Sequence, residues 1–122
     1  MAFDASTLQR LAADEEVWIE TTRPDGTVRR TVIWVIVAGD DVFVRSVRGD
    51  RGHWYQAALD RPAEVALVIG GDRVPVAARP AADEASVTTC SRGLELKYRA
   101  DPSLASMLRP GVLHTTLRLE PR

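Results

Sequence analysis

The chain is poor in several residue types, and each shortage narrows what the protein can be. Its 122 residues include one cysteine, Cys90, which excludes an internal disulfide and favours a reducing compartment. The two histidines, His53 and His114, lie far apart and lack metal-ligand spacing to Cys90, so no metal site is expected. Asparagine is absent, and Lys97 is the single lysine beside fifteen arginines.

Long apolar runs are also missing. The longest, from Val32 to Ala38, has the length of a strand and falls short of the roughly 18 residues that cross a bilayer. The first residues lack the basic-then-apolar layout of a secretion signal, so we expect a cytoplasmic protein. The formal net charge of −1 differs from the basic excess of nucleic-acid binders. Neither a membrane nor a nucleic acid is therefore expected as a partner.

Recognisable catalytic motifs are absent as well. The sequence has no Ser/His/acid grouping, no Walker loop and no dinucleotide fingerprint. The acidic runs Asp14-Glu15-Glu16 and Asp83-Glu84 are most simply the solvated ends of elements. No catalytic residue is assigned.

What is present is a series of short strands separated by tight turns. The alternation of residues predicts strands over 17–22, 28–37, 42–47, 65–69, 73–79 and 112–120. Helices are expected from a capping box at Ser6 to about residue 13, and over 54–59, 83–99 and 102–108. Six consecutive strands in one small domain predict an α+β fold in which an antiparallel sheet curls into a barrel.

Several large side chains have two possible roles. In the expected helix 83–99, Val87, Cys90, Leu94 and Tyr98 recur at helical spacing and form an apolar stripe that should be buried. Lys97 should be solvated. Trp34 and Trp54 could flank a planar ligand or belong to the core. Residues 32–37 are apolar on both faces, so this strand should be covered by the barrel on one side and by a partner on the other.

Arginines gather at one end of the expected hairpin 28–37/42–47. A turn near Gly39 and Asp40 pairs residues whose numbers sum to about 79, which puts Arg30 opposite Gly49, Thr31 opposite Arg48 and Trp34 opposite Arg45. The basic residues expected at the open end are Arg29, Arg30, Arg48 and Arg51. One interpretation is that they share a bound anion, assisted by the glycine-containing loop and the helix N-terminus that follow. The other is that they are solvated and pair with nearby aspartates, namely Asp25, Asp40, Asp50 or Asp60.

A segment around these arginines resembles a known superfamily. The run Arg45-Ser46-Val47-Arg48-Gly49-Asp50-Arg51-Gly52-His53-Trp54-Tyr55, with Arg29-Arg30-Thr31-Val32-Ile33-Trp34 before it, is similar to the flavin- and deazaflavin-binding split barrels. These include pyridoxamine-phosphate oxidase-like proteins and deazaflavin-dependent nitroreductases. With Lys97-Tyr98 later, the chain resembles still more closely an uncharacterised bacterial domain family within this superfamily. The resemblance covers about residues 17–119.

The resemblance implies a six-stranded antiparallel split β-barrel with flanking helices, which occupies residues 1–122 as one domain and forms a homodimer. It implies FMN as cofactor, or alternatively a deazaflavin coenzyme, and an oxidoreductase acting on a small organic molecule. A non-enzymatic barrel that binds flavin, haem or another anion is the alternative. The implied cofactor-binding residues are Arg30, Thr31, Val32, Ile33, Arg45, Ser46, Arg48, Arg51 and Trp54. The helix ends in Arg61-Pro62 where the nitroreductases have Asn-Pro, which leaves the choice of cofactor open.

Overall fold

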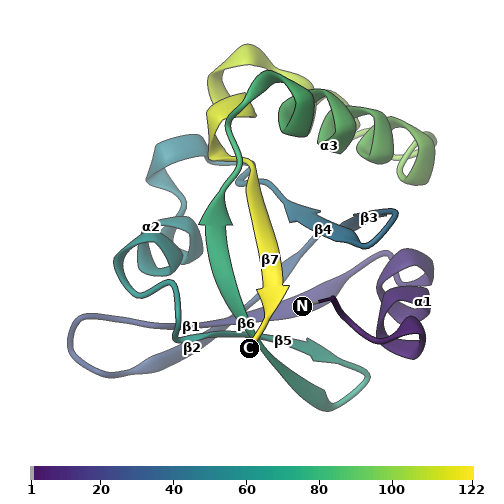
Figure 1. Ribbon diagram of the computed structural model, residues 1–122. Helices are drawn as coiled ribbons and strands as arrows, with labels where there is room; N and C mark the ends of the chain where they lie inside the picture. Colours follow the sequence, from purple (N-terminus) through teal and green to yellow (C-terminus); the bar gives the residue numbers. More distant parts are fainter. Residues whose placement is uncertain (1) are drawn as a thin grey trace.

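The computed structural model describes residues 2–122 as one antiparallel sheet of seven strands with helices around it (Figure 1). The strand order is β2-β1-β5-β6-β7-β4-β3. The elements in chain order are α1 (Ala5–Ala13), β1 (Val17–Thr22), β2 (Val28–Ile33), β3 (Ile36–Ala38), β4 (Asp41–Val44), the 3-10 helix η1 (Gly49–Arg51), α2 (His53–Asp60), β5 (Val65–Ile69), β6 (Asp72–Pro80), α3 (Glu84–Lys97), α4 (Leu104–Leu108), the 3-10 helix η2 (Pro110–Thr115) and β7 (Leu117–Pro121).

The predicted α+β class is confirmed, but the predicted count of six strands is wrong: the sheet has seven, because the strand expected over 28–37 is divided in two. Its first part, β2, pairs with β1, with Val17 opposite Ile33, while its second part, β3, pairs with β4, with Ile36 opposite Phe43. The two outermost strands of the sheet, β2 and β3, are thus joined by only Trp34 and Val35. A sheet whose edges are so joined has to curl, and the structure is a curled half-barrel.

The division also changes the predicted hairpin. In the β3–β4 ladder, Val37 lies opposite Val42, as a turn at Gly39 and Asp40 predicts. The pairings predicted for Arg30, Thr31 and Trp34 are wrong, because β2 pairs with β1 and not with β4. In the β1–β2 ladder, Arg30 lies opposite Glu20.

The crossover between β2 and β3 is held by the end of α3. The Val35 backbone N–H donates a hydrogen bond to the Tyr98 hydroxyl (3.1 Å), and the Tyr98 ring stacks on Trp34 with centroids 4.0 Å apart. Lys97 Nζ donates to the backbone oxygens of Val35 (2.6 Å) and Leu11 (2.8 Å). Tyr98 is buried as predicted, but the prediction of a solvated Lys97 is wrong because the helix end carries its ammonium group onto these carbonyls.

Polar side chains set the ends of several elements. The Asp4 carboxylate accepts from the Thr7 N–H (2.7 Å), so α1 begins earlier than the capping box expected at Ser6. The strand predicted over 112–120 begins only at Leu117 because the preceding residues form η2. The Thr115 and Thr116 hydroxyls stabilise η2 by donating to the backbone oxygens of residues 112 and 113.

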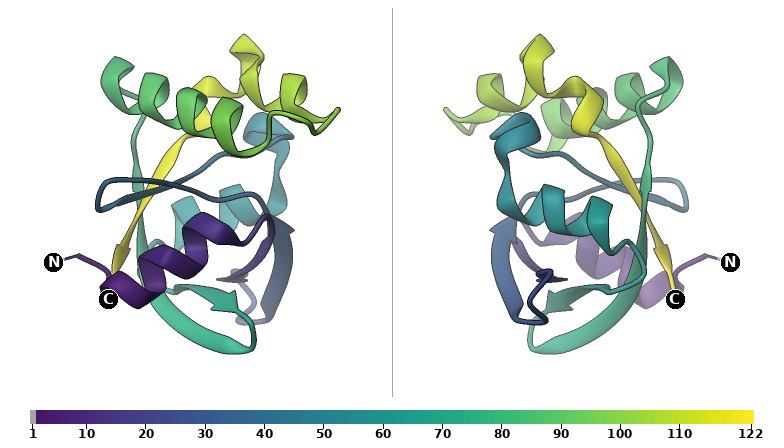
Figure 2. Two further views of the ribbon diagram at one scale, coloured as in Figure 1. Left: turned by 90° about the vertical axis from the view of Figure 1, so that its right-hand side faces the viewer. Right: turned by 90° about the vertical axis from the view of Figure 1, so that its left-hand side faces the viewer.

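The helices cover different parts of the half-barrel. In Figures 1 and 2, α1 and α2 lie on opposite sides of the molecule and α3 crosses one end of the sheet. One core fills the curl of the sheet and contains Leu11, Ile19, Leu67 and Trp54. A second core lies under α3 and contains Cys90, Leu94 and Tyr98 of the stripe predicted from helical spacing, whereas Val87 is only partly buried.

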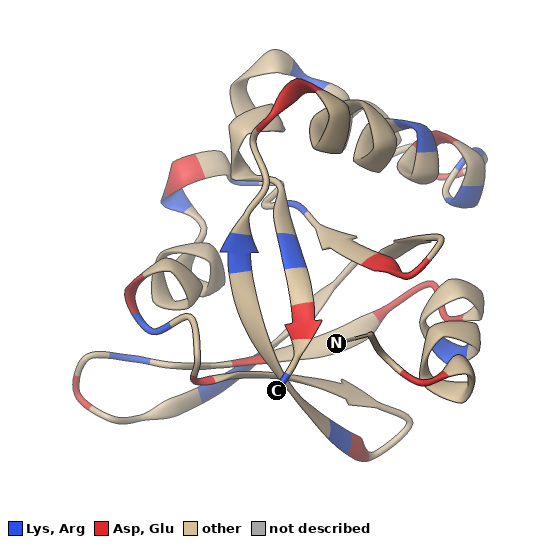
Figure 3. Ribbon diagram, in the orientation of Figure 1, with Lys and Arg blue, Asp and Glu red and all other residues tan. Residues whose placement is uncertain are grey.

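The surface carries charges of both signs. Basic and acidic residues are interspersed over the β1–β2 hairpin and around η1 (Figure 3). Within residues 2–122, no helix combines the length and apolar character that crossing a bilayer requires.

Candidate functional site

Two adjoining cavities follow the outer strand β2. The first, of about 320 Å³, is lined by Arg29, Thr31, Val32, Ser46, Val47, Arg48, Gly52, His53 and Trp54. The second, of about 240 Å³, is lined by Glu16, Val32, Ile33, Trp34, Arg45, Val47, Trp54, Ser103 and Met107. They share Val32, Val47 and Trp54, so we treat them as one β2 groove with a cationic end (the first cavity) and an aromatic end (the second).

The cationic end is formed by arginines from two separate segments. Arg29 comes from β2 and Arg48 from the loop after β4, and within residues 2–122 neither forms an ion pair or a side-chain hydrogen bond. Because side chains alternate along a strand, Arg29 and Thr31 share one face of β2 and Arg30 points to the other. Two free guanidinium groups therefore border the cavity.

On the opposite face of β2, Arg30 takes part in a structural ion pair. Its Nε lies 3.2 Å from the Glu20 carboxylate, whose second oxygen lies 2.8 Å from Arg73 Nε. Burial alone would raise the pKa of Glu20, but hydrogen bonds from the two arginines bring that pKa below its ordinary value. Arg30 does not line the groove, and the structure puts Arg29 where the sequence suggested Arg30.

The loop between β4 and α2 approaches the groove closely because it contains glycine at Gly52. The Ser46 hydroxyl donates to the Gly49 backbone oxygen (2.8 Å), and a Cβ at Gly52 would lie only 2.3 Å from Ser46 Oγ. Gly52 is also the N-cap of α2, which has no side-chain cap. The N–H groups in the first turn of α2 therefore remain available to an anion in the cationic end.

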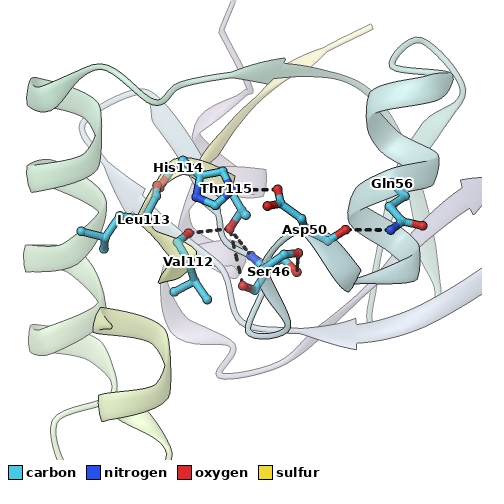
Figure 4. A network of polar contacts seen from close by, with 9 residues as sticks. Ser46, Asp50, Gln56, Val112, Leu113, His114 and Thr115 are labelled. Atoms are coloured by element: carbon cyan, nitrogen blue, oxygen red, sulfur yellow. Dashed lines mark hydrogen bonds and ion pairs between the residues drawn. The ribbon is translucent and has the colours of Figure 1, made fainter. Parts of the chain in front are cut away.

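Segment η2 braces this loop from outside (Figure 4). The Ser46 N–H donates to Thr115 Oγ1 (3.1 Å), and His114 Nε2 lies 2.7 Å from Asp50 Oδ1. Gln56 Nε2 donates to the Asp50 backbone oxygen (2.7 Å), which ties η1 to α2. These contacts join residues far apart in the sequence and hold the loop beside the groove.

Arg45 lines the aromatic end, but its guanidinium is used for internal bonds. The side chain is 2% exposed. Four hydrogen bonds reach neutral acceptors, namely Thr116 Oγ1 (2.9 Å), Ser91 Oγ (3.0 Å), Met107 O (3.0 Å) and Val87 O (3.1 Å). Burial lowers the pKa of Arg45 below its ordinary value. Arg45 thus fastens α3, α4 and the start of β7 to the half-barrel, and its donors are engaged away from the cationic end.

The structure gathers most of the residues predicted for the site. Thr31, Val32, Ser46, Arg48 and Trp54 meet at the cationic end, and Val32, Ile33, Arg45 and Trp54 at the aromatic end. Arg51 borders a separate cavity next to the cationic end.

Sequence reasoning missed five lining residues, one of which is Val47, between the predicted Ser46 and Arg48. His53 could have been found, since it begins the helix that follows the glycine-containing loop. Glu16, Ser103 and Met107 carry no local signal, because only the tertiary fold brings them to Trp34.

Solved structures of low sequence identity share this fold. Campylobacter jejuni ChuZ aligns with a TM-score of 0.80 at 10% identity over 96% of this chain, and this chain spans about half (52%) of ChuZ. A putative pyridoxamine 5'-phosphate oxidase from Listeria innocua aligns with a TM-score of 0.69 at 14% identity, covering 96% of this chain and 91% of its own. An F420-H2 dependent reductase, FDR-A, gives 0.60 at 18%, covering 87% and 94%. No curated protein matches the chain.

The barrel-like fold expected from the resemblance is shared with these structures. The resemblance to a bacterial domain family is confirmed by a family model that matches residues 7–119. That family is described as "Uncharacterized protein conserved in bacteria (DUF2255)", and the chain belongs to it.

Proposed function

We propose that the β2 groove binds a phosphate-bearing flavin or deazaflavin, with FMN as the first candidate and a deazaflavin coenzyme as the second. The observation that carries the proposal is the polarity of the groove. Arg29, Arg48 and the uncapped start of α2 border one end, and Trp34, Ile33 and Met107 border the other. A ligand with a phosphate at one end and a planar ring at the other matches this arrangement.

The residues of the groove fit such a ligand in chemistry and in size. Guanidinium groups and helix N–H groups are the usual partners of phosphate. The start of α2 borders the cavity, because Gly52, His53 and Trp54 are in its lining. The outer edge of β2 offers backbone groups to a ring that lies along Thr31 to Ile33. The two cavities together fall within the range of about 300–1,000 Å³ that is typical of small-molecule sites.

In this proposal the protein is an oxidoreductase that acts on a small organic molecule. The bound cofactor supplies the hydride chemistry, and the residues of the chain position it and shield it from water. The names of the structural neighbours, a putative pyridoxamine 5'-phosphate oxidase and an F420-H2 dependent reductase, support this reaction class. The cytoplasmic location predicted from the sequence remains a prediction.

A homodimer is part of the proposal because the groove is open along the outer face of the β1–β2 hairpin. Val32 borders both cavities, is 42% exposed and lies opposite Trp18, which is 46% exposed. A second copy packed on this face would bury both side chains and cover the groove.

The experiment is a visible absorption titration of the purified protein with FMN and, separately, with the deazaflavin coenzyme. We expect saturable binding of one of them and a Kd that rises about tenfold or more in Arg48→Gln and Arg29→Gln, because each loses a charge-assisted hydrogen bond. Arg92→Gln is the matched control, since it removes the same charge from the exposed surface of α3, away from the groove and from the β1–β2 hairpin. An equal rise in Kd in Arg92→Gln, or none in Arg29→Gln and Arg48→Gln, would contradict the assignment of the groove.

A second measurement separates the enzyme from a binding module without turnover. The bound cofactor is reduced chemically, and its reoxidation is followed with a panel of small organic acceptors. Acceptor-dependent reoxidation supports the oxidoreductase. Tight binding with none, or saturable binding of haem in place of either flavin, supports the non-enzymatic alternative.

A further inference from the structure

A third cavity adjoins the cationic end of the groove on its outer side. It has a volume of about 620 Å³ and is bordered by Arg48, Arg51, Arg109, His53 and Asp50, together with Gly49 and Gly111. Arg48 and His53 also line the cationic end, so the two cavities are neighbours across these side chains. We call this third cavity the arginine shelf.

The shelf has an excess of positive charge. Within residues 2–122, Arg48 and Arg51 form no ion pair or side-chain hydrogen bond, and Arg109 donates only to the backbone oxygens of Ser106 and Val47. Asp50 is the one carboxylate in the lining, and its Oδ1 already faces His114 Nε2 at 2.7 Å. Three guanidinium groups therefore border the shelf without a carboxylate bound to any of them.

The lining of the shelf also differs in kind from the aromatic end. Of the residues that form it, none has an aliphatic side chain, and the one aromatic ring is the imidazole of His53. Such a surface suits a charged, solvated group, whereas a flavin ring is better matched by Trp34 and Ile33 in the groove. Arginine clusters of this kind bind phosphates and carboxylates through paired N–H donors.

We propose that the arginine shelf holds a second anionic group of the ligand in the β2 groove, beyond the phosphate at Arg29 and Arg48. This inference rests on the proposed function. It names the ligand class as a cofactor with an anionic extension: either the second phosphate of a dinucleotide or the carboxylates of an acidic tail. A mononucleotide would leave Arg51 and Arg109 without an anionic partner.

The test compares ligands that share a ring and differ in the extension. Kd values are measured for FMN against FAD, and for the deazaflavin coenzyme with and without its acidic tail, on wild type and on Arg51→Gln. We expect Arg51→Gln to weaken the extended ligand on the order of tenfold and the short one less than about twofold. Arg92→Gln, an exposed arginine on α3, is the control for the change in net charge.

Each outcome has a definite meaning. The ligand pair in which Arg51→Gln selectively weakens binding of the extended member more strongly shows whether the extension is a phosphate or a carboxylate. An equal rise in Kd for the short and the extended ligand, or no rise in either, overturns the proposal. If no ring ligand binds, the proposed function fails, and the shelf is tested with tripolyphosphate against orthophosphate by isothermal titration calorimetry. A selective loss of tripolyphosphate binding in Arg51→Gln supports the shelf even then, and an unchanged Kd overturns it.

Discussion

At the scale of single residues, Arg45 shows how a charge is kept inside this small domain. A buried cation is costly unless its donors are satisfied. Four of the five guanidinium N–H groups of Arg45 bind neutral oxygens, and no carboxylate is among them. The side chain therefore lies beneath the aromatic end of the groove with its donors satisfied by the protein itself.

Lys97 gives the protein a predicted pH dependence. Burial is the main cause that lowers its pKa from 10.5 to about 8, and the nearby Asp14 and Glu15 oppose the shift only in part. Between these two pH values the unfolded chain binds more protons than the native state, so stability rises with pH. In Lys97→Met, which keeps the apolar stem, we expect this gain to be absent.

The measurement is urea unfolding of wild type and Lys97→Met between about pH 7 and pH 9.5. The free energy of unfolding of wild type relative to the variant should increase across this window. Buried Cys90 and Tyr98 titrate at higher pH in the native state, but both are present in each protein and largely cancel in the difference. A difference that does not change with pH would contradict the prediction.

The pair Arg29 and Arg30 marks how far a site residue could be predicted from the sequence. Because side chains alternate along a strand, the sequence predicts that the two arginines point to opposite faces of β2. It does not predict which face borders the groove. That depends on the register with β1, where Glu20 lies opposite Arg30 and draws it outward. The cluster of arginines was predictable from the sequence, but which of the two borders the groove was not.

At the scale of elements, the crossover between β2 and β3 depends on a hydroxyl far away in the sequence. Tyr98 accepts a hydrogen bond from the Val35 N–H and donates to the Glu15 backbone oxygen. In Tyr98→Phe the ring still stacks on Trp34, but the buried N–H loses its partner, which costs about 1–3 kcal/mol. We expect that loss in urea unfolding, together with faster hydrogen exchange at the Val35 amide.

Tyr55→Phe is the matched control for this substitution. Tyr55 is also buried, but its hydroxyl forms no hydrogen bond within residues 2–122, so its removal should change stability by less than about 0.5 kcal/mol. Equal losses in the two variants would show that Tyr98 contributes only through packing.

This crossover also explains the main error in the predicted fold. Residues 28–37 are uniformly suited to a strand, and no glycine or proline marks a break at Trp34 or Val35. The break is imposed by Tyr98 and Lys97, about sixty residues later in the chain. The local turn at Gly39 and Asp40, by contrast, carries its own signal, and its register was predicted correctly.

At the scale of the whole molecule, the exposed apolar face of the β1–β2 hairpin predicts self-association. Trp18, Val28 and Val32 are 46%, 60% and 42% exposed on the same face, next to the open side of the groove. Trp18 and Val32 lie opposite each other, and the Arg30–Glu20 ion pair separates them from Val28. An exposed apolar pair beside an open groove favours an interaction site. A second copy is the occupant that the superfamily resemblance implies.

Light scattering coupled to size exclusion should therefore give twice the 13.4 kDa mass of the chain for wild type. Trp18→Glu should give a monomer, because a carboxylate in an apolar interface is strongly unfavourable. The control Leu96→Glu, at an apolar residue 70% exposed on α3, should stay dimeric. Because the second copy covers the groove, the Kd of FMN or the deazaflavin coenzyme should rise on the order of tenfold in Trp18→Glu alone. A monomeric wild type would contradict the dimer and mean that the groove functions within one chain. Dissociation by Leu96→Glu but not by Trp18→Glu would place the dimer interface on α3.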